Sequence, residues 1–430
     1  MSGGPVTVPA APAGSLRDGH AFHLFWAAES VSQFGTYIGN TLLPLLAATA
    51  LAATPLEMGL LSAAETTGYL LIGLPAGVWV ARARQRRLMR RASAGRALLL
   101  CTLPAAWWGG LLTVTQLIVV ALLCGVLAVL FDVAYQSHLP ALVAREGLVR
   151  GNARLQSSQS LAQIAGPGVG GALAQLAGPA YPVLATALGY LASCALLRRV
   201  REPDPAGAAG GAGGALFAEI GAGLRFLGRD RTLLAITGCT ATANFFAGVL
   251  SAVQVLFLTQ VLGLTGSVVG AVLAVLGLGG VLGALSAYRV VRRIGQARAV
   301  WLVPSVTFPA LLLVPLAGRG PLLAPALLGL FVMGYGVVVY NVAQVSYRQA
   351  VCPEAMLARV NATVRFVGFG AMTVGALTGG VLGTSLGIRA TLWAAACGSC
   401  LAAVWVVCSP LRGMREFAAA GEREFASGQG

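Results

Sequence analysis

The sequence predicts an all-α membrane protein with twelve transmembrane helices in two parallel six-helix repeats. Three observations lead to this prediction: an apolar composition, a one-sided distribution of arginine, and an internal repeat of about half the chain length. The 430 residues are 57% hydrophobic and only 10% charged, and the mean hydropathy is +0.80. A soluble domain carries about 25% charged residues. This chain therefore has too few polar side chains to cover a soluble surface.

Twelve apolar runs follow one another along the chain, each near the roughly 20 residues that one crossing of the hydrocarbon layer requires. The first six are predicted at 22–47, 58–81, 97–114, 117–139, 157–176 and 181–197. The second six are predicted at 233–262, 268–288, 300–316, 322–345, 366–386 and 390–407. These runs predict an N-terminal bundle over 21–198 and a C-terminal bundle over 232–410.

Three further segments are polar or rich in small residues. Residues 1–20 predict a disordered cytoplasmic tail without a cleavable signal, and residues 411–430 predict a second cytoplasmic tail. Residues 199–231 predict a flexible linker on the cytoplasmic side. Within the linker, apolar residues recur on one helical face between Phe217 and Leu227, which indicates a short helix on the membrane surface.

The arginines predict the topology. All 29 basic residues are arginine, and only Arg319 and Arg389 lie in connections that follow odd-numbered helices. The others lie in the tails and the even-numbered connections, which is the pattern of a protein with both termini in the cytoplasm. The connection after the second helix is predicted to hold seven of them: Arg82, Arg84, Arg86, Arg87, Arg90, Arg91 and Arg96. The net charge of +15 is thus explained by topology rather than by nucleic-acid binding.

Absences from the sequence exclude several classes of function. A chain without lysine cannot form a P-loop or a Schiff base. The three histidines are too scattered for a metal site, and no nucleophile and base share a helix face. We therefore expect no enzyme activity, no cofactor and no metal. Glycine clusters at 166–171 and 277–283 lie inside apolar segments, so they indicate close helix packing rather than a dinucleotide loop.

An internal repeat relates the two halves of the chain. Residues 131–178 align with residues 340–387 without a gap, at 14 identities in 48 positions, whereas about five would arise by chance in so biased a composition. Six helices per copy is an even number, so both copies cross the membrane in the same sense. Parallel repeats of this kind are the architecture of secondary transporters whose two bundles rock around a central site.

Four stretches resemble a known family: 131–140 (FDVAYQSHLP), 165–168 (AGPG), 341–350 (NVAQVSYRQA) and 387–393 (GIRATLW). They resemble the major facilitator superfamily, specifically its enterobactin-exporter-like branch of transmembrane secretion effectors, and the resemblance extends over residues 22–410. It implies the major facilitator fold and a substrate–proton antiporter that exports small molecules. The superfamily's Gly-x-x-x-Asp-Arg loop reads GVWVAR here, so Ala81 replaces its carboxylate.

Glu29 and Glu65 are the only carboxylates well inside predicted helices. A charge at mid-bilayer costs about 2.5–3.5 kcal/mol, and burial favours the neutral, protonated acid. Both are therefore candidate proton-coupling residues. Gln33, Tyr37 and Asn40 share a helix face with Glu29 and are predicted to line the substrate cavity. The alternatives are that Glu29 is a structural hydrogen-bond anchor and that Glu65 packs between the halves.

Asp132 resembles the acid of the superfamily's inner gate. The resemblance implies Arg82, Arg86 or Arg365 as its partner, and the alternative role for Asp132 is proton carrier. In the repeat, Asn341 occupies the position that corresponds to Asp132. The second half therefore lacks an intramembrane acid, and we predict proton coupling in the first half.

Polar residues in the second half are further candidates for the cavity. They are Asn244, Gln254 and Tyr335. The alternative is that they join neighbouring helices by hydrogen bonds.

Together these features predict a proton-coupled exporter of a small, amphipathic organic molecule such as a drug, a siderophore or a natural product. We expect a monomer in the bacterial inner (cytoplasmic) membrane. The bacterial origin is expected because Ala- and Gly-rich, lysine-free sequences are typical of GC-rich bacterial genomes. The alternatives are an importer or uniporter of the same fold and, in another class, a membrane sensor or accessory protein without transport activity.

Overall fold

The computed structural model describes residues 19–142, 148–178, 180–200, 225, 227–228, 230–352 and 354–413. The predicted tails and nearly all of the linker with its surface helix lie outside these residues. Within them the chain is all-α, with twelve α-helices that correspond one to one to the predicted helices.

The first six helices are α1 (Gly19–Ala50), α2 (Pro55–Arg82), α3 (Gln85–Trp108), α4 (Val114–Leu142), α5 (Leu148–Ala177) and α6 (Ala180–Arg199). The second six are α8 (Arg231–Leu256), α9 (Gly266–Ile294), α10 (Gln296–Thr307), α11 (Ala324–Val351), α12 (Glu354–Ser385) and α13 (Ile388–Val407). A π-helix, η2 (Phe257–Val261), continues α8, and a 3-10 helix, η3 (Phe308–Leu313), continues α10. Two further 3-10 turns, η4 (Gly320–Leu323) and η5 (Pro410–Gly413), precede α11 and follow α13.

Helix α3 starts much earlier than predicted. The connection between α2 and α3 consists only of Ala83 and Arg84, so the prediction of a long arginine-rich loop was wrong. Arg86, Arg87, Arg90, Arg91 and Arg96 belong to α3 instead. Hydropathy detects only the apolar part of a helix, whereas arginine is a good helix former whose charged end reaches water beyond the hydrocarbon.

Two helix starts are fixed by polar side chains. At α2, the Glu57 carboxylate accepts from the backbone N–H of Thr54 at 2.8 Å, and the Thr54 hydroxyl accepts from the backbone N–H of Glu57 at 3.3 Å. This capping box satisfies two amide donors that a helix end leaves unpaired. At α8, Asp230 accepts from the backbone N–H groups of Thr232 and Leu233.

Polar and apolar helices are distributed unequally between the halves. In the part of the chain that the structure describes, eight helical spans are long and apolar enough to cross a membrane, and these are α4, α6 and all six helices of the second half. The remaining four, α1, α2, α3 and α5, belong to the first half. Helices that carry polar residues within the membrane face a cavity or a partner, so the first half is expected to hold the polar site.

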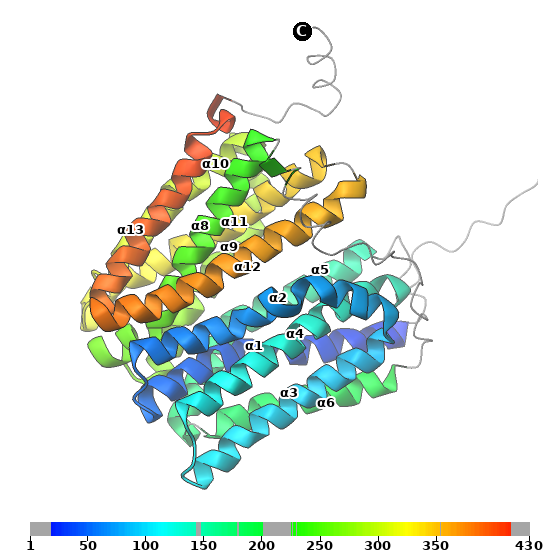
Figure 1. Cartoon of the computed structure of the whole chain (residues 1–430), viewed down its shortest axis with the longest axis vertical. Coiled ribbons are helices and arrows are strands. Elements are labelled where there is room, and N and C mark those ends of the chain that lie inside the picture. The colour runs from blue at the N-terminus through cyan, green and yellow to red at the C-terminus, as the bar shows by residue number, and fades with distance from the viewer. Residues whose placement is uncertain are drawn as a thin grey trace, which may run out of the picture.

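The helices pack as two groups, α1–α6 and α8–α13 (Figure 1). Helix α2 lies along α12, and α5 lies along α9. Glycine permits these close approaches: a Cβ on Gly59 of α2 would lie 2.6 Å from the Cα of Gly380 on α12, and a Cβ on Gly171 of α5 would overlap the carbonyl oxygen of Gly266 on α9. Small residues at helix crossings allow backbones to touch in this way.

The contacts between the groups favour one side of the molecule. We call the side with the start of α1 and the end of α13 the terminal side, and the opposite one the far side. From the far side inward, α2 and α12 touch at Gly59 and Gly380, then through the Thr66 and Thr373 hydroxyls at 2.8 Å. The stacked rings of Tyr69 and Phe369 follow at 4.1 Å. Towards the terminal side the two groups spread apart (Figure 1).

Candidate functional site

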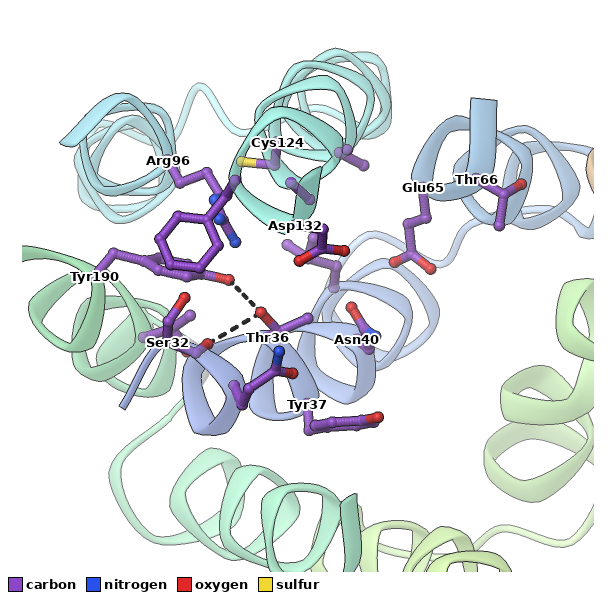
Figure 2. A pocket seen from close by; sticks show the side chains of 18 of the residues that line it. Ser32, Thr36, Tyr37, Asn40, Glu65, Thr66, Arg96, Cys124, Asp132 and Tyr190 are labelled. Atoms are coloured by element: carbon purple, nitrogen blue, oxygen red, sulfur yellow. Dashed lines mark hydrogen bonds between the residues drawn. The ribbon is translucent and has the colours of Figure 1, made fainter. Parts of the chain in front are cut away.

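A cavity of about 400 Å³ lies inside the first group of helices. Helices α1 to α6 all contribute to its wall, whereas the second half contributes only Phe369 and Met372 of α12. Figure 2 shows polar side chains from several helices pointing into the same space. Five residues predicted from the sequence line this cavity: Gln33, Tyr37, Asn40, Glu65 and Asp132.

Helix α1 presents a polar face to the cavity. Gln33, Tyr37 and Asn40 lie on it, as the helical spacing predicts, together with Ser32 and Thr36. The Thr36 hydroxyl bonds to the Ser32 carbonyl and to the Tyr190 hydroxyl of α6, each at 3.0 Å (Figure 2). These bonds fix α1 against α6, so its polar face is held towards the cavity.

Glu29 lies next to the cavity rather than in its wall. Its side chain is buried, and its Oε1 accepts from Nε2 of Gln33 at 2.6 Å. Oε2 has no hydrogen-bond partner among the described residues. Gln33 itself lines the cavity, so a single amide separates the Glu29 carboxyl group from any occupant.

Two other acids reach the cavity directly. Glu65 lies in the wall, and its Oε1 is buried without a hydrogen-bond partner in the described residues. Asp132 accepts a short hydrogen bond from the Tyr69 hydroxyl. Because the Tyr69 ring also stacks on Phe369, this tyrosine connects an acid of the first half to α12 of the second.

Tyr69→Phe is expected to slow transport while retaining the ring stack with Phe369. The substitution removes the Tyr69 hydroxyl that donates to Asp132, and a hydrogen bond to a charged group contributes about 1.5–3 kcal/mol. We expect a fall in turnover of roughly tenfold or more, measured as initial transport rate in proteoliposomes. Tyr69→Leu removes the stack as well and should be slower still; equal rates for wild type and Tyr69→Phe would contradict a role for this bond.

Asp132 and Arg365 interact electrostatically in this conformation, but no hydrogen bond joins them in the described part of the chain. Asp132 lies in the cavity wall, about three turns before the end of α4. Arg86 donates to the backbone carbonyl of Val200 at the end of α6, and Arg365 is exposed on α12. The side chain of Arg82 lies outside the described residues. The gate pairing stays a prediction, and this open arrangement fits the spread of the helices on the terminal side.

The polar candidates of the second half are not among the residues that line the cavity. Asn244 donates to the Thr240 carbonyl at 2.8 Å within α8, and Tyr335 of α11 accepts from the Ser286 hydroxyl of α9 at 3.0 Å. Gln254 has a buried Nε2 without a partner in the described part of the chain. For Tyr335 the structure thus shows the alternative role, a hydrogen bond between neighbouring helices.

Arg96 is the main site residue that the sequence analysis missed. It was assigned to a loop, yet it lies in the cavity wall and is only 3% exposed. Its guanidinium carbon lies 4.8 Å from the ring centroid of Phe131 and 4.7 Å from that of Tyr190. One signal distinguishes it from the other arginines of this segment: small residues precede it and an apolar run follows it directly. Helical spacing could also have indicated two other missed residues. Thr36 lies four residues after Ser32 on the same face of α1, and Tyr69 lies four residues after Glu65 on the same face of α2.

Two six-helix groups, the first of which encloses a polar cavity, define a membrane transporter of the secondary-transporter fold. Residues 25–373 match the family model of the Major Facilitator Superfamily. The match covers most of the chain, which therefore belongs to this superfamily, as its sequence predicts. The finer assignment to the enterobactin-exporter-like branch stays a prediction.

Solved structures of other transporters share the fold. A mutant of the nucleoside transporter NupG superposes with a TM-score of 0.76 at 12% identity, covering 90% of this chain and 99% of that one. A bacterial homologue of the human lysosomal transporter Spinster, inward-facing and occupied, gives 0.72 at 14% identity, covering 91% and 97%. A bacterial homologue of the iron transporter ferroportin, in an inward-facing state, gives 0.71 at 14% identity, covering 90% and 98%. No curated protein matches the chain.

Proposed function

We propose that this protein is a proton-coupled exporter that moves a small, amphipathic organic molecule across the bacterial inner membrane by alternating access. The observation that carries the proposal is the pair of acids at the cavity, Glu29 and Glu65, each with one carboxyl oxygen that lacks a hydrogen-bond partner among the described residues. A buried acid can take up and release a proton as its surroundings change.

The bond between Gln33 and Glu29 supplies a route for coupling. Gln33 lines the cavity and donates to Glu29. An occupant that donates a hydrogen bond to the Gln33 side-chain carbonyl strengthens the N–H bond from Gln33 to Glu29, which stabilises the ionised Glu29 carboxylate and favours release of its proton. Glu65 lies in the wall itself, where an occupant and a proton compete for the same carboxylate. Such competition is the requirement for exchange of substrate against protons.

The distribution of charge supports cytoplasmic access to the cavity. Outside the cavity, the described arginines lie on the terminal side except for Arg319 and Arg389, which lie on the far side. An excess of arginine marks the cytoplasmic face, so the terminal side is assigned to the cytoplasm. The helices spread apart on that side (Figure 1), where a substrate for export would enter. The function is assigned to the monomer, because the cavity lies within one chain.

The test is transport by the purified full-length protein in liposomes that contain a trapped pH indicator. Anionic, neutral and cationic fluorescent aromatic dyes serve as probes, with a pH gradient imposed in either direction. A proton-coupled exporter moves at least one dye against its gradient, and protons flow the opposite way. Dye movement that ignores the pH gradient would instead indicate a uniporter, and protons moving together with the dye would indicate an importer. No flux of any dye would contradict the proposal.

A further inference from the structure

We propose that the cavity recognises a zwitterionic amphipathic molecule, with Arg96 binding its anionic group and Glu65 binding its cationic group. This inference rests on the proposed transport function and names the class of substrate. It depends on two buried charged groups that the structure leaves partly without partners at the same cavity.

Arg96 offers a built site for an anion. It is almost completely buried, and its Nε and Nη2 atoms have no hydrogen-bond partner among the described residues. A guanidinium stays charged under all physiological conditions. Asp132 and Glu29 interact with this charge electrostatically, but buried N–H groups without acceptors remain unfavourable. The Nε and Nη2 groups therefore call for a hydrogen-bond acceptor that the described residues do not supply, and the positive charge favours an anionic one.

The guanidinium of Arg96, held between two aromatic rings, determines which anionic groups can bind. Phe131 and Tyr190 hold the guanidinium at 4.8 and 4.7 Å from their centroids. Cation–π contacts partly compensate the charge but leave the N–H groups without acceptors. Two parallel N–H groups at the edge of a guanidinium match the two oxygens of a carboxylate or phosphate. The anionic group is therefore a planar carboxylate or a phosphate oxygen pair, and not a single hydroxyl.

Glu65 provides the opposite pole. Figure 2 shows Arg96 and Glu65 at opposite sides of the cavity, with Asp132 between them. Asp132 already accepts a hydrogen bond from the Tyr69 hydroxyl, whereas Oε1 of Glu65 has no hydrogen-bond partner among the described residues. A purely anionic substrate would face two cavity acids, and a purely cationic substrate would leave the Nε and Nη2 groups of Arg96 without an acceptor. A molecule with both charges satisfies both ends.

The two charges also account for exchange against protons. A cationic group at Glu65 stabilises the ionised carboxylate and displaces its proton. An anion alone would instead favour the protonated acid and so would move together with protons. A zwitterion thus reconciles a buried arginine in the site with the proposed antiport.

The test uses four ligands with one indole body: tryptophan as zwitterion, tryptophanamide as cation, N-acetyltryptophan as anion and N-acetyltryptophanamide as neutral form. Affinity for the purified full-length protein is measured by equilibrium dialysis. We expect the zwitterion to bind at least about tenfold more tightly than the neutral form, with the singly charged forms between, because each charge-assisted bond contributes at this level.

Variants assign each charge to its residue. In Arg96→Gln, tryptophan should bind no better than tryptophanamide; in Glu65→Gln, it should bind no better than N-acetyltryptophan. Arg84→Gln, at an exposed arginine outside the cavity, should keep the wild-type order. Arg96→Lys keeps the charge without the paired N–H geometry, so it should give an intermediate preference, and it replaces Arg96→Gln if that variant does not fold.

Equal affinities for tryptophan and tryptophanamide in the wild type, or an unchanged preference in Arg96→Gln, would overturn the inference. Binding is measured without a membrane potential or pH gradient. The expected ranking of the four ligands by affinity can therefore be observed even if no pH-driven flux occurs. That result would contradict the proposed exporter but not the zwitterion. Conversely, pH-driven flux with equal affinities for all four ligands would contradict the zwitterion proposal but not the proposed exporter.

Discussion

Replacing Glu29 by glutamine is expected to remove pH-driven transport while leaving the fold intact. Glutamine has nearly the same shape as glutamate and keeps a carbonyl oxygen that can accept the bond from Gln33, but it cannot take up or release a proton. Uptake driven by an imposed pH gradient should fall to the level of protein-free vesicles, whereas exchange of labelled for unlabelled substrate without a gradient should continue. Thermal unfolding should stay close to that of the wild type.

Glu57→Gln provides the matched control for this substitution. Glu57 belongs to the capping box of α2, where glutamine can replace glutamate without losing the cap, so pH-driven uptake should be unchanged. Glu65→Gln is the companion variant at the cavity wall. Full pH-driven uptake in both Glu29→Gln and Glu65→Gln would contradict proton coupling through this cavity.

Adding a methyl group at Gly171 is expected to drive the halves apart on the far side. A Cβ there would overlap the Gly266 carbonyl oxygen and lie 3.1 Å from the Cα of Gly270, so the α5–α9 contact cannot close without a shift of backbone. Overpacking costs about 1–3 kcal/mol, which corresponds to a population change of roughly five- to 150-fold. Gly171→Ala should therefore favour the state that opens to the far side and slow transport.

Spin-label distances check this expectation. One pair, at Thr113 and Leu386, reports on the far side, and a second pair, at Arg84 and Arg289, reports on the terminal side. In Gly171→Ala the far-side distance should lengthen and the terminal-side distance should shorten. Gly168→Ala is the control on the same helix, because a Cβ there meets no atom within 4 Å. Distances in Gly171→Ala that match those of Gly168→Ala would show that this contact does not set the balance between states.

Much of the fold follows from the sequence because hydropathy and arginine placement act locally along the chain. All twelve helices were predicted, and the polar face of α1 with Gln33, Tyr37 and Asn40 follows from helical periodicity alone. The helix ends did not follow, because a helix continues past the hydrocarbon for as long as its backbone hydrogen bonds and arginine side chains allow. This error placed Arg96 in a loop.

The site was less predictable because its membership depends on how helices rotate against one another. Asn244 and Tyr335 satisfy every sequence criterion for a cavity residue, yet their polar atoms bond to Thr240 and Ser286. Conversely, Tyr69 is recognised as a site residue only from its contacts: its hydroxyl donates to Asp132 on α4, and its ring stacks on Phe369 of α12. Pairings between residues more than sixty positions apart are not encoded in any local pattern of a single sequence.

The cavity takes nearly all of its wall from one half of the chain, so we expect substrate selectivity to depend mainly on that half. We expect substitutions in α8–α13 at positions other than Phe369 and Met372 to change the cycling rate without changing the substrate, since these two are the second-half residues that line the cavity in the described part of the chain. A chimaera that joins this first half to the second half of a relative should inherit its selectivity from the first and its speed from the second.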